Sequence, residues 1–101
     1  MSNFRSKKIT DKWPQEVPFC MYCGEPNMGQ IVACHFSAIK FGKGTGIKAH
    51  DICAMLCDKC HALADGAIGP HLTKEQRELI LYEGIYRTFL WALQEGRLVV
   101  K

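Results

Sequence analysis

The strongest pattern of hydrophobic and polar positions lies in the last third of the chain, over residues 73–95. Apolar residues recur there at helical spacing and would share one face: Leu79, Tyr82, Tyr86, Phe89, Leu90 and Leu93. Thr73 and Gln76 form a capping-box pattern at the start, and Gly96 is a natural helix end. The pattern predicts a long helix over 73–95. Its aromatic side chains would belong to the core first and to an interface second.

Shorter patterns predict the other elements. Residues 30–36 are rich in strand formers and predict a strand, whereas the glycine-rich residues 40–50 predict a loop. Residues 56–65 should run into a short helix that stops at Gly66, and residues 97–101 read as a short terminal strand. The basic lead-in, residues 1–18, is expected to be loosely ordered. Residues 19–101 would then form a single α+β domain.

Composition excludes several classes of protein. The chain of 101 residues is 48% hydrophobic and 23% charged, which is typical of a globular domain. It has no apolar run near the ~18 residues that a membrane span needs, and its N-terminus lacks the apolar stretch of a signal peptide. Six cysteines without a secretion signal favour metal binding over disulfides. We therefore expect a cytoplasmic protein.

Two Cys-x-x-Cys knuckles carry the most specific chemistry. They consist of Cys20 and Cys23, and of Cys57 and Cys60. A two-residue spacing lets both thiolates of a knuckle reach one ion, so the four cysteines predict a tetrahedral structural zinc site. A redox dithiol is the alternative. A zinc ion closed by four thiolates has no open position, so the catalyst of any reaction must lie elsewhere.

A histidine and an aspartate are candidates for acid–base chemistry. His35 follows the predicted strand, and a neutral imidazole can accept the proton that water loses when it attacks a phosphodiester. Asp51 could accept a hydrogen bond from the other ring nitrogen and so fix the tautomer. The alternatives are a surface histidine and an aspartate that only caps a turn.

His61 and Asp65 stand four residues apart on the predicted helix, so their side chains would share one face. Such a pair can hold a catalytic divalent ion, Mg²⁺ or Mn²⁺, and leave positions open for water and phosphate oxygen. The alternative is an exposed pair that only forms its own hydrogen bond.

Charge favours a polyanionic partner without establishing one. The net charge is +3, and residues 1–50 carry seven basic against three acidic side chains. Lys40, Lys43 and Lys48 flank or lie in the glycine loop, where backbone amides could approach a phosphate, so we expect them to contact nucleic acid. A solvated basic surface is the alternative. Four residues receive no firm role: Cys34 and Cys53, expected to be buried thiols, and His50 and His71.

Taken together, these residues resemble a family of small prophage-encoded HNH-like nuclease domains. The resemblance covers roughly residues 20–100 and rests on short strings: Ala33-Cys34-His35, Gly44-Thr45-Gly46-Ile47-Lys48 with Asp51, Cys57-x-x-Cys60-His61 with Asp65, Glu83-Gly84, Arg87-Thr88, Trp91 and Glu95-Gly96. It implies a zinc-braced ββα-metal core in a phage or prophage protein of the bacterial cytoplasm. It also implies that His35 is the general base, that Asp51 steadies it, and that His61 and Asp65 are metal ligands.

The sequence thus predicts a metal-dependent endonuclease that cuts DNA phosphodiesters, with the long helix as a possible homodimer surface. The form of the DNA stays open. Cys34 stands where many HNH enzymes carry an acidic metal ligand, and Asp51 replaces the usual asparagine. A zinc module that binds nucleic acid without cutting it, or an adaptor of phage replication or recombination, therefore remains an alternative.

Overall fold

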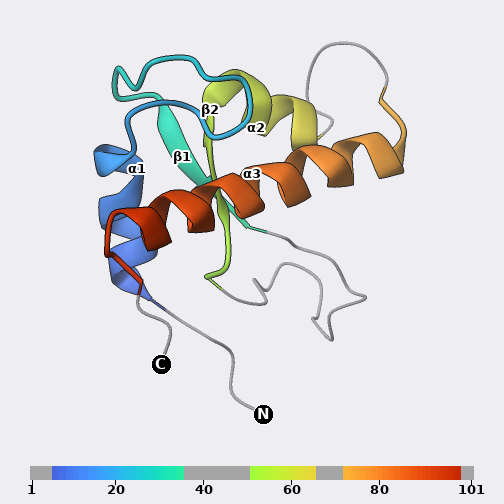
Figure 1. Ribbon diagram of the computed structural model, residues 1–101. Coiled ribbons are helices and arrows are strands. Elements are labelled where there is room, and N and C mark those ends of the chain that lie inside the picture. The colour runs from blue at the N-terminus through green and yellow to red at the C-terminus, as the bar shows by residue number, and fades with distance from the viewer. Residues whose placement is uncertain (1–5, 36–50, 66–71, 99–101) are drawn as a thin grey trace.

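The protein is a small α+β fold in which a β-hairpin is flanked by helices (Figure 1). A computed structural model describes residues 6–35, 51–65 and 72–98. In those ranges no helix is both long and apolar enough to cross a membrane. The elements in chain order are a π-helical turn η1 (Lys8–Lys12), α1 (Trp13–Glu16), β1 (Ile31–Cys34), β2 (Ala54–Cys57), α2 (Asp58–Asp65) and α3 (Lys74–Gln94).

The hairpin confirms the strand expected within residues 30–36. In the described ranges β1 and β2 form an antiparallel two-stranded sheet, with Ile31 opposite Cys57 and Cys34 opposite Ala54. All four residues of β2 are buried, whereas β1 is buried at its two ends and more exposed at Val32 and Ala33 between them. The chain passes directly from β2 into α2, as expected for residues 56–65.

The long helix forms as predicted, but it packs on β2 through a different face from the predicted one. Its buried residues recur every four positions: Ile80, Gly84, Thr88 and Ala92. These residues are mostly small, so the helix axis comes close to the strand. A Cβ atom on Gly84 would lie 2.8 Å from the Cβ of Ala54 and 2.9 Å from a methyl carbon of Leu56. Gly84 therefore marks a close approach of α3 to β2.

The face predicted to enter the core is exposed instead. Five of its large side chains are accessible to solvent: Leu79, Tyr82, Tyr86, Leu90 and Leu93. Phe89 is partly buried against the core, and so is Trp91. The prediction of the core face was wrong because hydrophobic size marked one side of the helix, whereas close packing on β2 selected the side with small residues.

Both ends of α3 follow the sequence signals. The Thr73 side chain accepts a hydrogen bond from the backbone N–H of Gln76, and the capping box is complete. At the other end Gly96 has a φ of 72°, and the Arg97 N–H donates to the Ala92 carbonyl at 2.8 Å. This turn folds the chain back on the helix. Arg97 and Leu98 are consequently not in a strand, so that part of the prediction was wrong; residues 99–101 lie outside the described ranges.

The N-terminal segment is more ordered than residues 1–18 were expected to be. Ile9, Trp13 and Val17 follow at intervals of four and are buried, because η1 and α1 wind them onto one face. The Trp13 ring packs edge-on against Phe89 and Trp91 of α3, with centroids 5.5 and 5.6 Å apart. The first and last helices therefore share a core on the side of the hairpin where Figure 1 draws α1.

Candidate functional site

The four knuckle cysteines come together between two tight segments of backbone. The first knuckle lies in a turn closed by hydrogen bonds from Cys20 N–H to the Glu25 carbonyl (2.8 Å) and from Gly24 N–H to the Cys20 carbonyl (3.0 Å). Gly24 has a φ of 84°, which suits glycine. The second knuckle lies where β2 ends and α2 begins, with Cys57 in the strand and Cys60 in the first turn of the helix.

The sulfur positions fit a tetrahedral zinc ion. The four Sγ atoms lie within 4.8 Å of one another. Zinc–thiolate bonds of about 2.3 Å at tetrahedral angles place sulfurs about 3.8 Å apart, and the Cys23 and Cys57 Sγ atoms are 3.7 Å apart. All four cysteines are free thiols rather than disulfides. The cluster could therefore hold a structural zinc ion, as the knuckle spacing predicts.

Backbone amides favour the thiolate form of one of these ligands. The Cys20 sulfur accepts hydrogen bonds from the N–H groups of Tyr22 (3.4 Å), Cys23 (3.5 Å) and Cys57 (3.3 Å). Burial alone would raise the pKa of Cys20, but these donors outweigh it and lower the pKa to about 7. Burial raises the pKa of Cys23 and Cys60. A cation among the sulfurs would supply the opposite charge that these thiolates need.

His35 and Asp51 meet although they are sixteen residues apart in sequence. The His35 Nε2 atom lies 2.9 Å from Asp51 Oδ1, and the two side chains are only 8% and 9% exposed. The second oxygen of Asp51 accepts a hydrogen bond from the Ser6 backbone N–H at 2.6 Å. The carboxylate is therefore held from two sides. If the Asp51 carboxylate accepts a hydrogen bond from Nε2–H, the lone pair of the ring lies on Nδ1.

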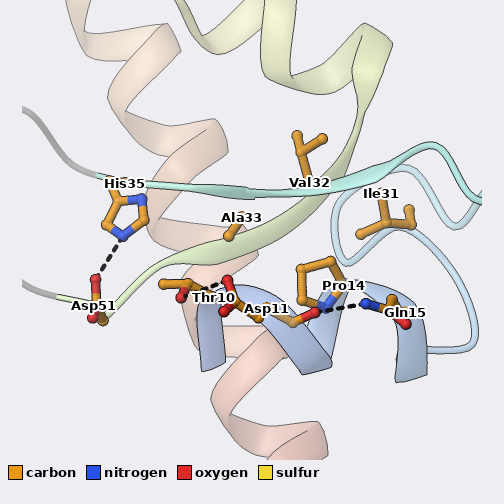
Figure 2. Close-up of a pocket in the computed structure, with 9 residues that line it drawn as sticks. All are labelled: Thr10, Asp11, Pro14, Gln15, Ile31, Val32, Ala33, His35 and Asp51. Carbon is orange, nitrogen blue, oxygen red and sulfur yellow. Dashed lines mark hydrogen bonds and ion pairs between the residues drawn. The ribbon is translucent and has the colours of Figure 1, made fainter. Parts of the chain in front are cut away.

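This pair lines an open pocket of about 810 Å³ between the first helical segment and β1. Figure 2 shows the His35 ring leaving the end of β1 toward Asp51, with Thr10, Asp11 and Gln15 along the opposite wall. These helical residues were not among the candidates from the sequence. The four-residue spacing of Ile9, Trp13 and Val17 is the signal that could have placed a helix beside the pocket.

His61 and Asp65 share one face of α2, as their spacing requires. The His61 Nε2 atom lies 3.0 Å from Asp65 Oδ2, and the side chains are 42% and 57% exposed. Within the described ranges, no third histidine, cysteine or acidic residue joins them in a metal-sized group; the four knuckle cysteines form the one such group found there. Asp65 nevertheless lies close enough to Cys34, at the end of β1, for its charge to add to burial in raising the pKa of that thiol.

The remaining candidates divide into two groups. Cys34 and Cys53 are buried free thiols, as expected. Lys40, Lys43 and Lys48 lie outside the described residues, as do His50 and His71. The predicted contact of the glycine loop with nucleic acid therefore stays a prediction.

No protein-family model matches the chain, and neither a curated protein nor a solved structure is significantly similar to it. The fold and the four-cysteine cluster define a small α+β protein with a potential zinc centre.

Proposed function

We propose that the protein is a metal-dependent endonuclease that hydrolyses DNA phosphodiester bonds. The observation that supports this proposal most strongly is the contact between His35 and Asp51 at the wall of an open pocket. A carboxylate bound to one ring nitrogen orients the imidazole and stabilises its protonated form, which is the arrangement of a general base. The resemblance to HNH-like nucleases, which rests on short sequence strings, implies the same role for His35.

In the proposed reaction Nδ1 of His35 accepts a proton from water as the water oxygen attacks phosphorus. The Asp51 carboxylate keeps the ring in the required tautomer and stabilises the imidazolium that forms. The Ser6 N–H holds the carboxylate in place through its other oxygen. Asp51 is in this way a positioning residue, and His35 is the residue that exchanges a proton with the reacting water.

The side chains of α2 offer a small donor set to a divalent cation. His61 and Asp65 offer one nitrogen and one oxygen on the same helical face, 3.0 Å apart. Mg²⁺ commonly uses one or two carboxylates together with water and phosphate oxygens, and Asp65 would supply one such carboxylate beside the softer imidazole of His61. When bound, such an ion would neutralise charge that develops on the phosphate and the leaving oxygen.

The cysteine cluster has a supporting role in this proposal. A zinc ion on Cys20, Cys23, Cys57 and Cys60 would fix the N-terminal knuckle to the junction of β2 and α2. His61 directly follows Cys60, so the same ion would also fix the backbone that presents the helical donors.

One observation favours a second candidate, a zinc module that binds DNA without cutting it. The His35 and Asp51 side chains are almost covered, and the acidic residue Asp11 lines the same pocket. A phosphate group entering the pocket would meet that negative charge. A binding module would instead use its basic surface, with an affinity that falls steeply as salt rises.

The test compares the zinc-loaded wild type with His35→Ala and with a matched control, His61→Ala. Each protein is incubated with supercoiled plasmid and with single-stranded DNA, in Mg²⁺, Mn²⁺ or EDTA. We expect metal-dependent cleavage that is lost in His35→Ala at every metal concentration. His61→Ala should instead need more divalent metal to reach a given rate. If the folded wild type binds DNA in a salt-dependent way but does not cleave it, the endonuclease proposal is wrong and the protein is the binding module.

A further inference from the structure

The outer face of α3 carries a stripe of large apolar side chains that the fold leaves in solvent. Tyr86 is 67% exposed and Leu79 is 63% exposed, although similar side chains fill the core elsewhere. We call this set the outer stripe: Leu79, Tyr82, Tyr86, Leu90 and Leu93. It lies opposite Ile80, Gly84, Thr88 and Ala92, the residues that contact β2 or lie toward it. Large apolar side chains gathered on one exposed face of a helix are a candidate interaction surface.

The outer stripe is symmetric along the chain about Tyr86. Tyr82 and Leu90 lie four residues to either side of it, and Leu79 and Leu93 lie seven residues to either side. With about 3.6 residues per turn, all five side chains point within about 40° of the direction of Tyr86. A helix turned end for end about Tyr86 therefore presents an almost identical stripe.

We propose that the outer stripe binds a second copy of this chain, with the two α3 helices antiparallel and a two-fold axis at Tyr86. A two-fold interface requires one patch that is complementary to itself, and the symmetric spacing provides it. In this register Tyr86 packs against Tyr86 of the second copy, and Leu79 packs against its Leu93. The spacing of three and four residues suits helices that cross at a small angle of about 20°.

The charges beside the stripe fit a second copy better than a nucleic acid. α3 carries three basic residues and three acidic ones, so it offers no positive field to a polyanion. Glu83 and Arg87 stand at one border of the stripe and pair with each other at 2.6 Å. In the antiparallel register Glu83 of one copy comes beside Arg87 of the other, because the two residues lie on opposite sides of the two-fold axis along the helix. The interface would then contain two attractive ion pairs, each between Glu83 of one copy and Arg87 of the other.

The size of the stripe indicates a weak dimer. From Leu79 to Leu93 the helix rises about 21 Å, and a helix is about 10 Å wide, so the footprint is about 200 Å². Stable complexes bury about 800 Å² of solvent-accessible surface on each partner, which is more than a single helix stripe of this footprint supplies. The protomer also has its own core around Trp13 and β2. We therefore expect monomer and dimer to exchange as the concentration changes, independently of any nuclease activity.

Sedimentation velocity over a concentration series tests the association. The wild type should shift from monomer to dimer as its concentration rises. Tyr86→Glu should remain monomeric, because it places two like charges on the axis. Met28→Glu is the matched control: Met28 is 85% exposed but lies outside the stripe, so this variant should dimerise like the wild type. A wild type that stays monomeric, or a Tyr86→Glu variant that still dimerises, would overturn the proposal.

A charge-swap experiment tests the register itself. Leu79→Glu and Leu93→Lys should each weaken dimerisation, and circular dichroism should show that both variants remain folded. The double variant Leu79→Glu/Leu93→Lys should recover the dimer, because opposite charges face each other twice in the antiparallel register. In a parallel register like charges would meet. A double variant no better than the single ones would therefore refute the antiparallel arrangement.

Discussion

Thr88 joins the middle of α3 to the free edge of β2, and its hydroxyl offers the sharpest test of how the fold is held together. Thr88 is fully buried. Its Oγ1 accepts a hydrogen bond from the Met55 N–H at 3.0 Å and donates one to the Gly84 carbonyl at 2.6 Å. The Met55 carbonyl, on the same edge, accepts from the Met21 N–H at 2.9 Å. Backbone groups of β2 that point away from β1 are thus satisfied by the helix and by the first knuckle.

Thr88→Val removes the hydroxyl and keeps the shape of the side chain. The cavity contribution is therefore small, and the main cost is a buried Met55 N–H without an acceptor, about 1–3 kcal/mol. For a domain of this size each kcal/mol lowers Tm by about 4–8 °C, so we expect a fall of about 5–20 °C. Thr10→Val is the matched control. The Thr10 hydroxyl makes only contacts of 3.3–3.5 Å in more accessible surroundings, and its loss should change stability by less than about 0.5 kcal/mol.

The assay is thermal unfolding followed by circular dichroism, with zinc at one fixed saturating concentration because a bound metal adds its own stabilisation. Amide hydrogen exchange adds a local measurement: the Met55 N–H should exchange faster in Thr88→Val than in Thr10→Val. If Thr88→Val melts with the wild type and its Met55 amide stays protected, another group satisfies the strand edge. The assignment of Thr88 as its acceptor would then be wrong.

Two further predictions concern close packing and the cysteine cluster. Gly84→Ala gains about 1 kcal/mol of helix propensity, but its methyl would lie 2.8 Å from Ala54 Cβ. The expected net result is a loss of up to about 2 kcal/mol in chemical denaturation, since overpacking costs about 1–3 kcal/mol; a stability greater than that of the wild type would show that α3 can move away from β2. Chelation of zinc should lower Tm and release one equivalent of zinc per chain, measured with a chromogenic chelator. Cys60→Ser should bind zinc much more weakly, whereas Cys53→Ser should still bind one equivalent.

The sequence predicted several local features correctly, although not the helical N-terminal segment or the conformation of Arg97 and Leu98, and it predicted the long-range packing poorly. The hairpin strand near Ile31, the capping box at Thr73 and the turn at Gly96 each depend on neighbouring residues, so a short window contains their cause. The inward face of α3 does not. The hydrophobicity of the side chains at Gly84, Thr88 and Ala92 is low. These residues face the core because their small size lets α3 pack closely on β2. That close packing cannot be read from the helix alone.

The candidate site divides in the same way. The four cysteines could be predicted as a group because the knuckle spacing itself fixes two ligands at a time. The contact of Asp51 with His35 was expected because a general base needs an orienting carboxylate. The hydrogen bond from the Ser6 N–H to that carboxylate was not expected. A hydrogen bond between residues 6 and 51 leaves no local trace in sequence. The helical wall of the pocket near Asp11 does leave one, the four-residue spacing of Ile9, Trp13 and Val17, but that spacing does not show what the helix packs against.

The packing of Trp13 against Phe89 and Trp91 has a consequence for biosynthesis. A ribosome adds about 5–20 residues per second, so several seconds separate the synthesis of Trp13 from that of Phe89 and Trp91. During that interval Trp13, Ile9 and Val17 have no helix to pack on, while the knuckles that could capture zinc are already complete by residue 60. Metal capture should therefore come before core formation in the nascent chain. Without zinc, this core would have to form while the first knuckle and the junction of β2 and α2 are not joined by a metal ion.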